Sequence, residues 1–182
     1  MLRELALHIL DLAENSLNAG ATLVTIEINE DEMADRLTIC IADNGCGMDA
    51  ESVQRVTDPF FTTRTTRRVG LGIPFLKQAT ELSNGSLTIE SQVGVGTTVT
   101  AIFQYSHLNR MPLGDVTNTI LGLVVGNPQS DFIYRHRAGE RFFEFDTRPI
   151  KQVLGDVPLS EPQVIEFLRR EISDSLAQIY GL

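Results

Sequence analysis

The stretch Leu12-Ala13-Glu14-Asn15-Ser16-Leu17-Asn18-Ala19-Gly20-Ala21-Thr22 closes a helix that the sequence predicts over residues 2–19. Apolar residues recur through this segment at helical spacing, and Gly20 follows at the position where helices commonly end. Four polar side chains share one stripe of the helix: His8, Asp11, Asn15 and Asn18. The opposite side is apolar, so we expect it to pack against a core.

The polar stripe has the chemistry of a cation site as well as that of an ordinary solvated helix face. A carboxylate one turn before an amide, as in Asp11 followed by Asn15, can orient or deprotonate a nucleophile. The amide oxygen can ligate a hard cation such as Mg²⁺. The stripe contains no lysine or arginine and is rich in short amides, which favours a site, although most polar stripes are solvated faces.

Three glycine-containing segments follow the helix. Asp43 to Gly47 comes directly after a predicted strand, and its glycines let the backbone approach a ligand closely. The Asp43 carboxylate can accept a hydrogen bond from an exocyclic amine of that ligand. Gly70-Leu71-Gly72 opens a helix just after Arg64, Arg67 and Arg68, which together suit phosphate. Gly94 to Thr98 opens a strand. Each segment alone is equally compatible with a turn or a mobile basic loop.

The remainder of the first half alternates between predicted strands and short helices. The strands are residues 22–29, 36–42, 86–91 and 97–105. The helices are residues 51–56 and a segment that Ile73-Pro74 opens and Asn84-Gly85 ends.

The second half, residues 106–182, is predicted to form a small α+β appendage. A helix over 115–125 precedes a hairpin of 132–137 with 141–145. Thr147 is expected to cap a helix over 149–154, and Ser160 with Gln163 to cap the last helix. One face of that helix is expected to be buried: Val164, Ile165, Phe167, Leu168, Ile172, Leu176 and Ile179. The aromatic residues of the hairpin either form the appendage's own core or an interface: Phe132, Tyr134, Phe142, Phe143 and Phe145.

Composition limits the classes of partner. The chain has 182 residues, 42% hydrophobic and 21% charged, as in an ordinary folded protein. Its formal net charge of −9 argues against nucleic acid or an anionic membrane surface as a partner. No apolar run approaches the roughly 20 residues of a membrane span, and the charged N-terminal residues do not resemble a secretory signal, so a cytoplasmic location is expected. The cysteines, Cys40 and Cys46, form neither a zinc site nor a disulfide framework.

In order and spacing, these segments resemble the motifs of the GHKL ATPase superfamily, which includes gyrase, the large heat-shock chaperones, histidine kinases and MutL. The segments that carry the resemblance are Leu12–Thr22, Asp43–Gly47, Asp58–Arg64, Val69–Ile73 and Gly94–Thr98. The resemblance covers residues 1–105. Asp58–Arg64 resembles the Phe box of histidine kinases, and its short spacing to Gly70-Leu71-Gly72 points to the histidine kinase branch. It implies an α+β two-layer sandwich, the Bergerat fold, in which helices cover one face of a mixed sheet.

By position, the resemblance implies a site for ATP and Mg²⁺. Asn15 would hold Mg²⁺ between the phosphates, Asp43 would bind the adenine amine, and Asp11 would be the catalytic base. Glu14 is the alternative base, but it lies about 100° from Asn15 around the helix. The implied nucleotide-binding residues are Asn15, Asn18, Asp43, Gly45, Gly47, Phe60, Thr62, Arg64, Arg68, Gly70, Leu71, Gly72 and Thr97.

The resemblance implies an ATP-dependent enzyme, but one element of a histidine kinase is not expected here. Such kinases carry an acceptor histidine on a dimerising helical hairpin, and His8, His107 and His136 lack that setting. We therefore expect a signalling kinase that phosphorylates a partner protein in trans. The alternatives are an ATP-driven conformational switch without phosphoryl transfer and a non-enzymatic nucleotide-sensing module, and a homodimer is compatible with each.

Overall fold

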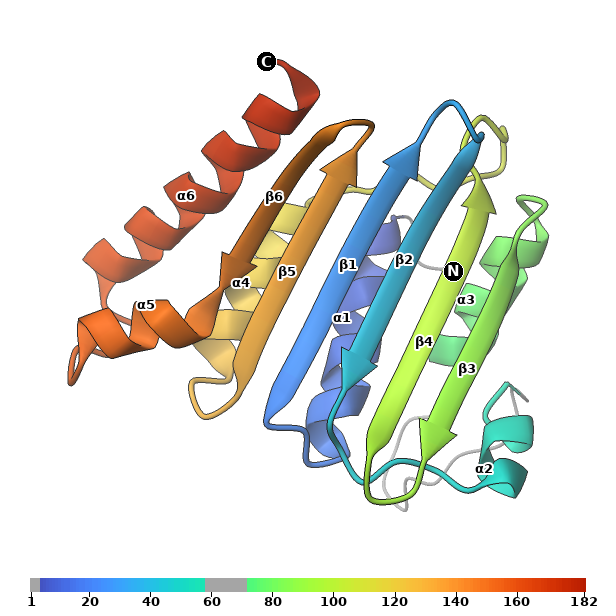
Figure 1. The fold of residues 1–182 in the computed structure, drawn as a ribbon, viewed down its shortest axis with the longest axis horizontal. Helices are drawn as coiled ribbons and strands as arrows, with labels where there is room; N and C mark the ends of the chain where they lie inside the picture. Colours follow the sequence, from blue (N-terminus) through green and yellow to red (C-terminus); the bar gives the residue numbers. More distant parts are fainter. Residues whose placement is uncertain (1–3, 58–71) are drawn as a thin grey trace.

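The structure is a computed structural model that describes residues 4–57 and 72–182. Its centre is a six-stranded sheet with the strand order β3-β4-β2-β1-β5-β6 (Figure 1). The strands are β1 (Leu23–Asp31), β2 (Arg36–Asp43), β3 (Ser86–Gln92), β4 (Gly96–Gln104), β5 (Asp131–Ala138) and β6 (Arg141–Asp146). The helices are α1 (Leu5–Asn18), α2 (Ala50–Arg55), α3 (Gly72–Glu81), α4 (Val116–Gly126), α5 (Thr147–Leu154) and α6 (Pro162–Tyr180).

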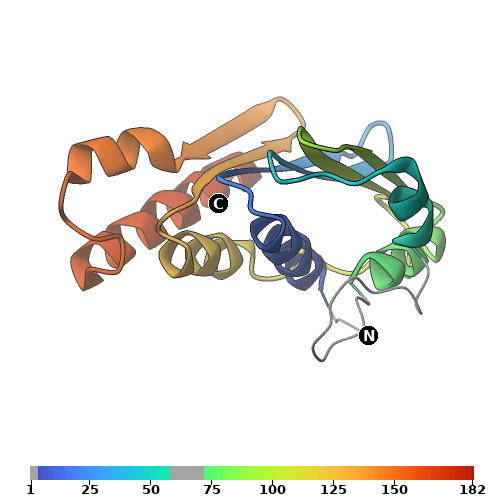
Figure 2. The same ribbon diagram turned by 90° about the horizontal axis from the view of Figure 1, so that it is seen from below.

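Helices cover one face of the sheet. Figure 2 shows α1, α3, α4 and α6 on the same side of the strands. The strands alternate accordingly, because successive side chains of a strand point to opposite faces. In β1 the side chains of Val24, Ile26 and Ile28 are buried, and those between them are partly exposed. The predicted α+β two-layer sandwich is confirmed.

The two halves of the chain meet at β1. This strand pairs antiparallel with β2 on one side and parallel with β5 on the other. The hairpin of β5 and β6 therefore extends the sheet that the first half builds, and buried side chains from both halves form one hydrophobic cluster. The division into residues 1–105 and 106–182 stays a prediction about function.

A second connection between the halves lies at the start of α1. The first N–H groups of a helix have no partner within it. Here the segment before α4 supplies them, because the carbonyl oxygens of Pro112 and Leu113 accept hydrogen bonds from the N–H groups of Leu5 and Ala6 at 2.9 and 2.8 Å. The helix that carries the polar stripe is thus held at its start by residues from the second half.

A buried polar network fastens the end of α6 to the sheet. The hydroxyl of Tyr180 donates to Oε1 of Glu30 at 2.5 Å, and Nε2 of His136 lies 2.8 Å from the same oxygen. The hydroxyl of Tyr134 lies 2.5 Å from Nδ1 of His136. The His136 ring thus lies between the Tyr134 hydroxyl on one side and the Glu30 carboxylate on the other. Burial alone would raise the pKa of Glu30, but the hydrogen bonds from His136 and Tyr180 hold that pKa below its ordinary value.

Two predicted helix caps were wrong. The carboxylate of Asp146, not Thr147, caps α5 by accepting from the N–H of Arg148, because the Thr147 hydroxyl accepts from the N–H of Phe132 at 2.9 Å. The residue before α6 is Glu161, and no side chain caps that helix, so the predicted box at Ser160 does not form.

The predicted buried face of α6 was too wide. Val164, Leu168, Ile172 and Ile179 are buried as expected, whereas Phe167 is 57% exposed. Only a narrow stripe of this helix reaches the edge of the sheet. The hairpin aromatics divide in the same way: Phe132, Tyr134 and Phe145 belong to the core, Phe143 packs against it, and Phe142 is half exposed.

Candidate functional site

A cavity of about 610 Å³ lies where α1, the loop after β2 and the turn between β3 and β4 converge. Its predicted site residues come from α1 and from the two strand ends: Asn15, Asn18, Asp43, Gly47 and Thr97. The remaining lining residues are Leu12, Ser16, Ala19, Ile41, Cys46, Met48, Asp49, Ser52, Val56, Ile73, Val93 and Val99. The walls are thus mainly apolar with a few polar groups, as is usual for sites that bind small organic molecules.

Three donors hold the Asp43 carboxylate at the wall of the cavity. Its Oδ1 accepts from the backbone N–H of Gly45 at 2.8 Å and of Thr97 at 3.3 Å. Its Oδ2 accepts from the hydroxyl of Ser16 at 2.6 Å. Donors from α1, from the loop after β2 and from β4 therefore orient one side chain at the cavity wall.

Glycines allow the loop after β2 and the β3–β4 turn to interlock. Gly47 has a φ of +66°, and a Cβ there would overlap the carbonyl oxygen of Gln92. The N–H of Gly94 donates to the carbonyl oxygen of Cys46 at 2.7 Å, and the N–H of Cys46 donates to the carbonyl oxygen of Ala19 at 2.9 Å. The loop is thereby fixed between the end of α1 and the β3–β4 turn.

The polar stripe of α1 leads from the cavity to the start of α3. A Cβ on Gly72 would lie 3.4 Å from Oδ2 of Asp11, so the Asp11 carboxylate faces the first residue of α3. Asn15 lies one turn further along the stripe and lines the cavity. A carboxylate near a helix N-terminus is favourably placed in the helix dipole.

His8, at the beginning of the stripe, is buried rather than part of the cavity. Its side chain is 2% exposed, and within the described parts of the chain neither ring nitrogen has a hydrogen-bond partner. Burial lowers the pKa of His8 from 6.5 to about 4, so the ring is neutral at neutral pH. His136 is buried as well, in the network with Glu30 and Tyr180.

The predicted residues thus separate into three groups. Asn15, Asn18, Asp43, Gly47 and Thr97 line the cavity. Asp11, Gly45 and Gly72 neighbour lining residues along the chain. The third group lies outside the described residues: Phe60, Thr62, Arg64, Arg68, Gly70 and Leu71.

Ser16 is the principal residue that sequence reasoning missed. It belongs to the buried face of α1, where a serine among Leu12, Ala13 and other apolar side chains is itself a signal. Met48 and Val56 could not be assigned to the cavity in advance because their place depends on the path of the loop after β2.

The donor set fits one Mg²⁺ ion bound mostly by other oxygens. Residues 4–57 and 72–182 contain no cluster of three or more His, Cys, Asp or Glu that could enclose a metal. The amide oxygen of Asn15 could provide one ligand, and Mg²⁺ commonly keeps waters and phosphate oxygens as the others.

No helix within residues 4–57 and 72–182 is long and apolar enough to cross a bilayer.

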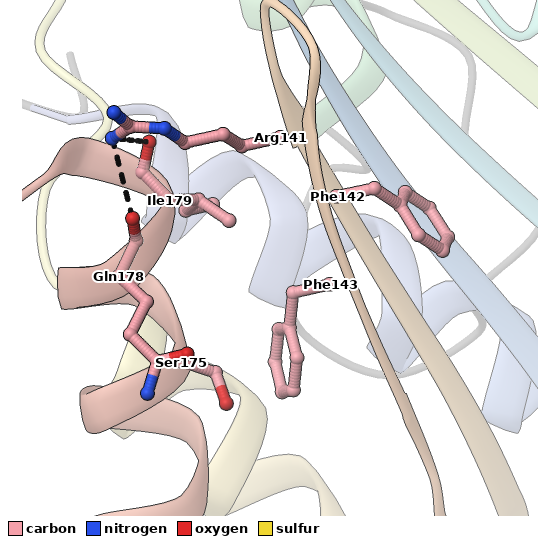
Figure 3. A pocket seen from close by; sticks show the side chains of 6 residues that line it. All are labelled: Arg141, Phe142, Phe143, Ser175, Gln178 and Ile179. Atoms are coloured by element: carbon pink, nitrogen blue, oxygen red, sulfur yellow. Dashed lines mark hydrogen bonds between the residues drawn. The ribbon is translucent and has the colours of Figure 1, made fainter.

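A second, smaller cavity of about 330 Å³ lies between α6 and the β5–β6 hairpin (Figure 3). Arg141 of the hairpin points over the end of α6, where its guanidinium donates to the carbonyl oxygens of Gln178 and Ile179 at 3.3 Å. The last carbonyls of a helix lack partners within it, and the carbonyl of Gln178 also accepts from the N–H of Gly181 at 3.2 Å. The contact therefore caps α6, together with the Tyr180 network.

The first half of the chain is similar in sequence to known proteins. Residues 2–107 match the family described as "Histidine kinase-, DNA gyrase B-, and HSP90-like ATPase". A putative sensor protein of Shewanella frigidimarina is 36% identical over 97 residues, which cover 52% of this chain and 15% of that protein. A probable C4-dicarboxylate sensor kinase of Bacillus subtilis is 31% identical over 97 residues, covering 51% of this chain and 18% of the kinase. The chain thus spans less than a fifth of the length of these relatives.

Solved structures show the same fold over more of the chain. The MutL ATPase domain of Aquifex aeolicus, complexed with ADP, has a TM-score of 0.53 and 19% identity, and the match covers 96% of this chain and 70% of that domain. The N-terminal domain of a DNA repair protein has a TM-score of 0.58 and 14% identity, over 80% of this chain and 52% of that one. The similarity of fold therefore extends past the residues that match the family.

Proposed function

Because the chain belongs to the histidine kinase-, DNA gyrase B- and HSP90-like ATPase family, we propose that its larger cavity binds Mg²⁺-ATP and that the chain phosphorylates a partner protein in trans. The observation that carries the ATP site is the Asp43 carboxylate, held at the wall of an apolar cavity by three donors. The probable sensor kinase of Bacillus subtilis among its relatives supports the proposed kinase activity.

The proposed roles follow the position of each side chain. Asp43 accepts a hydrogen bond from the adenine amine, with Gly47 and Thr97 beside the base and Gly45 holding the carboxylate. Asn15 holds Mg²⁺, which neutralises phosphate charge when bound, and Asn18 lines the same side of the cavity.

Several candidate phosphate-binding residues lie outside the described residues. We assign phosphate contacts to Arg64, Arg68 and the segment from Gly70 to Gly72, and further nucleotide contacts to Phe60 and Thr62. Asp11 is the proposed catalytic base, because its carboxylate faces Gly72, where that segment joins α3.

We further propose that residues 1–105 contain the nucleotide site and that residues 106–182 contact the partner protein or a second copy of the chain. The half-exposed Phe142 and the exposed Phe167 favour a contact role for the second half. Sedimentation of the purified chain with and without ATP would distinguish a homodimer from a monomer that binds a different protein.

Calorimetric titration with Mg²⁺-ATP tests the site. Asn15→Ala and Asp43→Ala are each expected to weaken ATP binding by about tenfold or more, because each removes a polar contact to the ligand. Asn29→Ala in β1 and Asp174→Ala in α6 are matched controls away from the cavity and are expected to bind as the wild type does. Unchanged affinity in both site variants would refute the proposal.

Transfer of γ-labelled phosphate tests the reaction. Incubation of the chain with labelled ATP and cell extract is expected to label a second protein. Free phosphate without a labelled protein would favour the ATP-driven switch, and neither product would favour a nucleotide sensor. Asp11→Asn is expected to lower turnover while ATP binding survives, and unchanged turnover would reject Asp11 as the base.

A further inference from the structure

We propose that Ser16 is a positioning residue that sets the base selectivity of the site by leaving Asp43 one acceptor position for the ligand. The inference rests on the proposed ATP site and names the contact that would select its base. It concerns a residue of α1 whose hydroxyl acts through Asp43, 27 positions away in the chain.

The two oxygens of Asp43 are held differently. Two backbone N–H groups, from Gly45 and Thr97, converge on Oδ1. Both of these donors act on one oxygen, so neither holds Oδ2 directly. The Ser16 hydroxyl donates to Oδ2 at 2.6 Å and so holds the second oxygen of the carboxylate in place.

Counting acceptor positions shows what remains for a ligand. An ionised carboxylate offers about four lone-pair positions. Donors from the described residues take three of them, and one position on Oδ2 of this cavity-lining side chain remains for a ligand. An N–H of an exocyclic amine satisfies this position. A carbonyl oxygen there would meet a negatively charged acceptor with no proton between them.

The setting of Ser16 supports a positioning role. The side chain is 5% exposed and lies on the face of α1 that otherwise carries apolar residues. A helical serine commonly donates to a carbonyl one turn earlier in its own helix. Here the hydroxyl reaches across to the end of β2 instead, at a short distance typical of a charge-assisted hydrogen bond.

The test compares two nucleotides that differ only in the amine. ATP carries the exocyclic amine, and purine riboside 5′-triphosphate carries a hydrogen in its place. Calorimetry of the full chain is expected to show that Ser16→Ala weakens ATP binding about tenfold. The same variant is expected to bind the purine nucleotide within about twofold of the wild type, because that ligand makes no contact with the freed carboxylate. Alanine suits a buried helix position, so the variant is expected to fold.

Ser91→Ala is the matched control. Its hydroxyl also lies behind the cavity, but it contacts Thr97 and the N–H of Met48 rather than Asp43. This control is expected to change the affinity for both nucleotides by the same factor. An equal loss for both nucleotides in Ser16→Ala, or no loss for either, would overturn the positioning role. A wild type that binds neither nucleotide would instead refute the ATP site itself.

Discussion

Replacement of His8 by leucine should remove an acid sensitivity that is built into α1. The imidazole is 2% exposed, and in the described structure neither ring nitrogen has a hydrogen-bond partner. Burial lowers its pKa from 6.5 to about 4. The unfolded chain therefore binds a proton at His8 in a pH range where the folded chain does not, and acid favours the unfolded state through this residue.

The sign and size of the pH effect on the free energy of unfolding follow from the difference between these two pKa values. Between pH 6.5 and about 4 the unfolded state binds more protons at His8 than the folded state does. The free energy of unfolding is therefore unaffected by this residue above pH 6.5 and decreases as the pH falls towards 4. Proton linkage with these two values gives a loss of about 2 kcal/mol between roughly pH 7 and pH 5. Below about pH 4 the ring is protonated in both states and the loss stops growing.

Urea unfolding of the wild type and His8→Leu across this range measures the effect. Carboxylates titrate in both proteins, so the difference between the two free energies of unfolding isolates His8. Relative to the wild type, the free energy of unfolding of the variant is expected to rise by about 2 kcal/mol from pH 7 to pH 5. At pH 7 it is expected to be at least as stable, because leucine places no unpaired polar atoms in the core. A pH-independent difference would refute the reasoning, as would a His8 resonance that titrates near 6.5.

Two further substitutions test the loop and the α6 anchor. Gly47→Ala should lower the free energy of unfolding by more than about 2 kcal/mol and abolish ATP binding, because its Cβ would overlap the carbonyl of Gln92. Gly94→Ala, with a φ of +77° but open space, should cost only about 1 kcal/mol, and equal losses in thermal melts would contradict the steric argument. Tyr180→Phe removes the hydroxyl that donates to Glu30 and should cost about 1–2 kcal/mol in urea unfolding, whereas an unchanged midpoint would show that the network does not anchor α6.

Local patterns predicted the parts of the fold that depend on local chemistry. Residues that are close together in the sequence determine the apolar period of α1, the alternation of β1 and the turn at Gly94. The position of Asp43 at the end of a strand and before two glycines is also a local signal, whereas its role toward a ligand stays a prediction. The predicted elements are confirmed because neighbouring residues decide them.

Pairing across long separations could not be predicted in the same way. No local pattern shows that β5 lies parallel to β1, and this pairing joins the hairpin of the second half to the sheet. The wrong cap at Thr147 has the same origin, because the partner of its hydroxyl, the N–H of Phe132, lies 15 positions away. Ser16 was missed because its partner, too, belongs to a distant strand.

The place of β1 in the sheet has a consequence for synthesis of the chain. β2 follows β1 at once, but β5 leaves the ribosome about 100 residues later. At a translation rate of about 5 to 20 residues per second, the edge of β1 that pairs with β5 stays unpaired for about 5 to 20 s. During that time the growing chain exposes an unpaired edge beside Val24, Ile26 and Ile28, a template for pairing with other chains. A translation stop near residue 105 would make that exposure permanent.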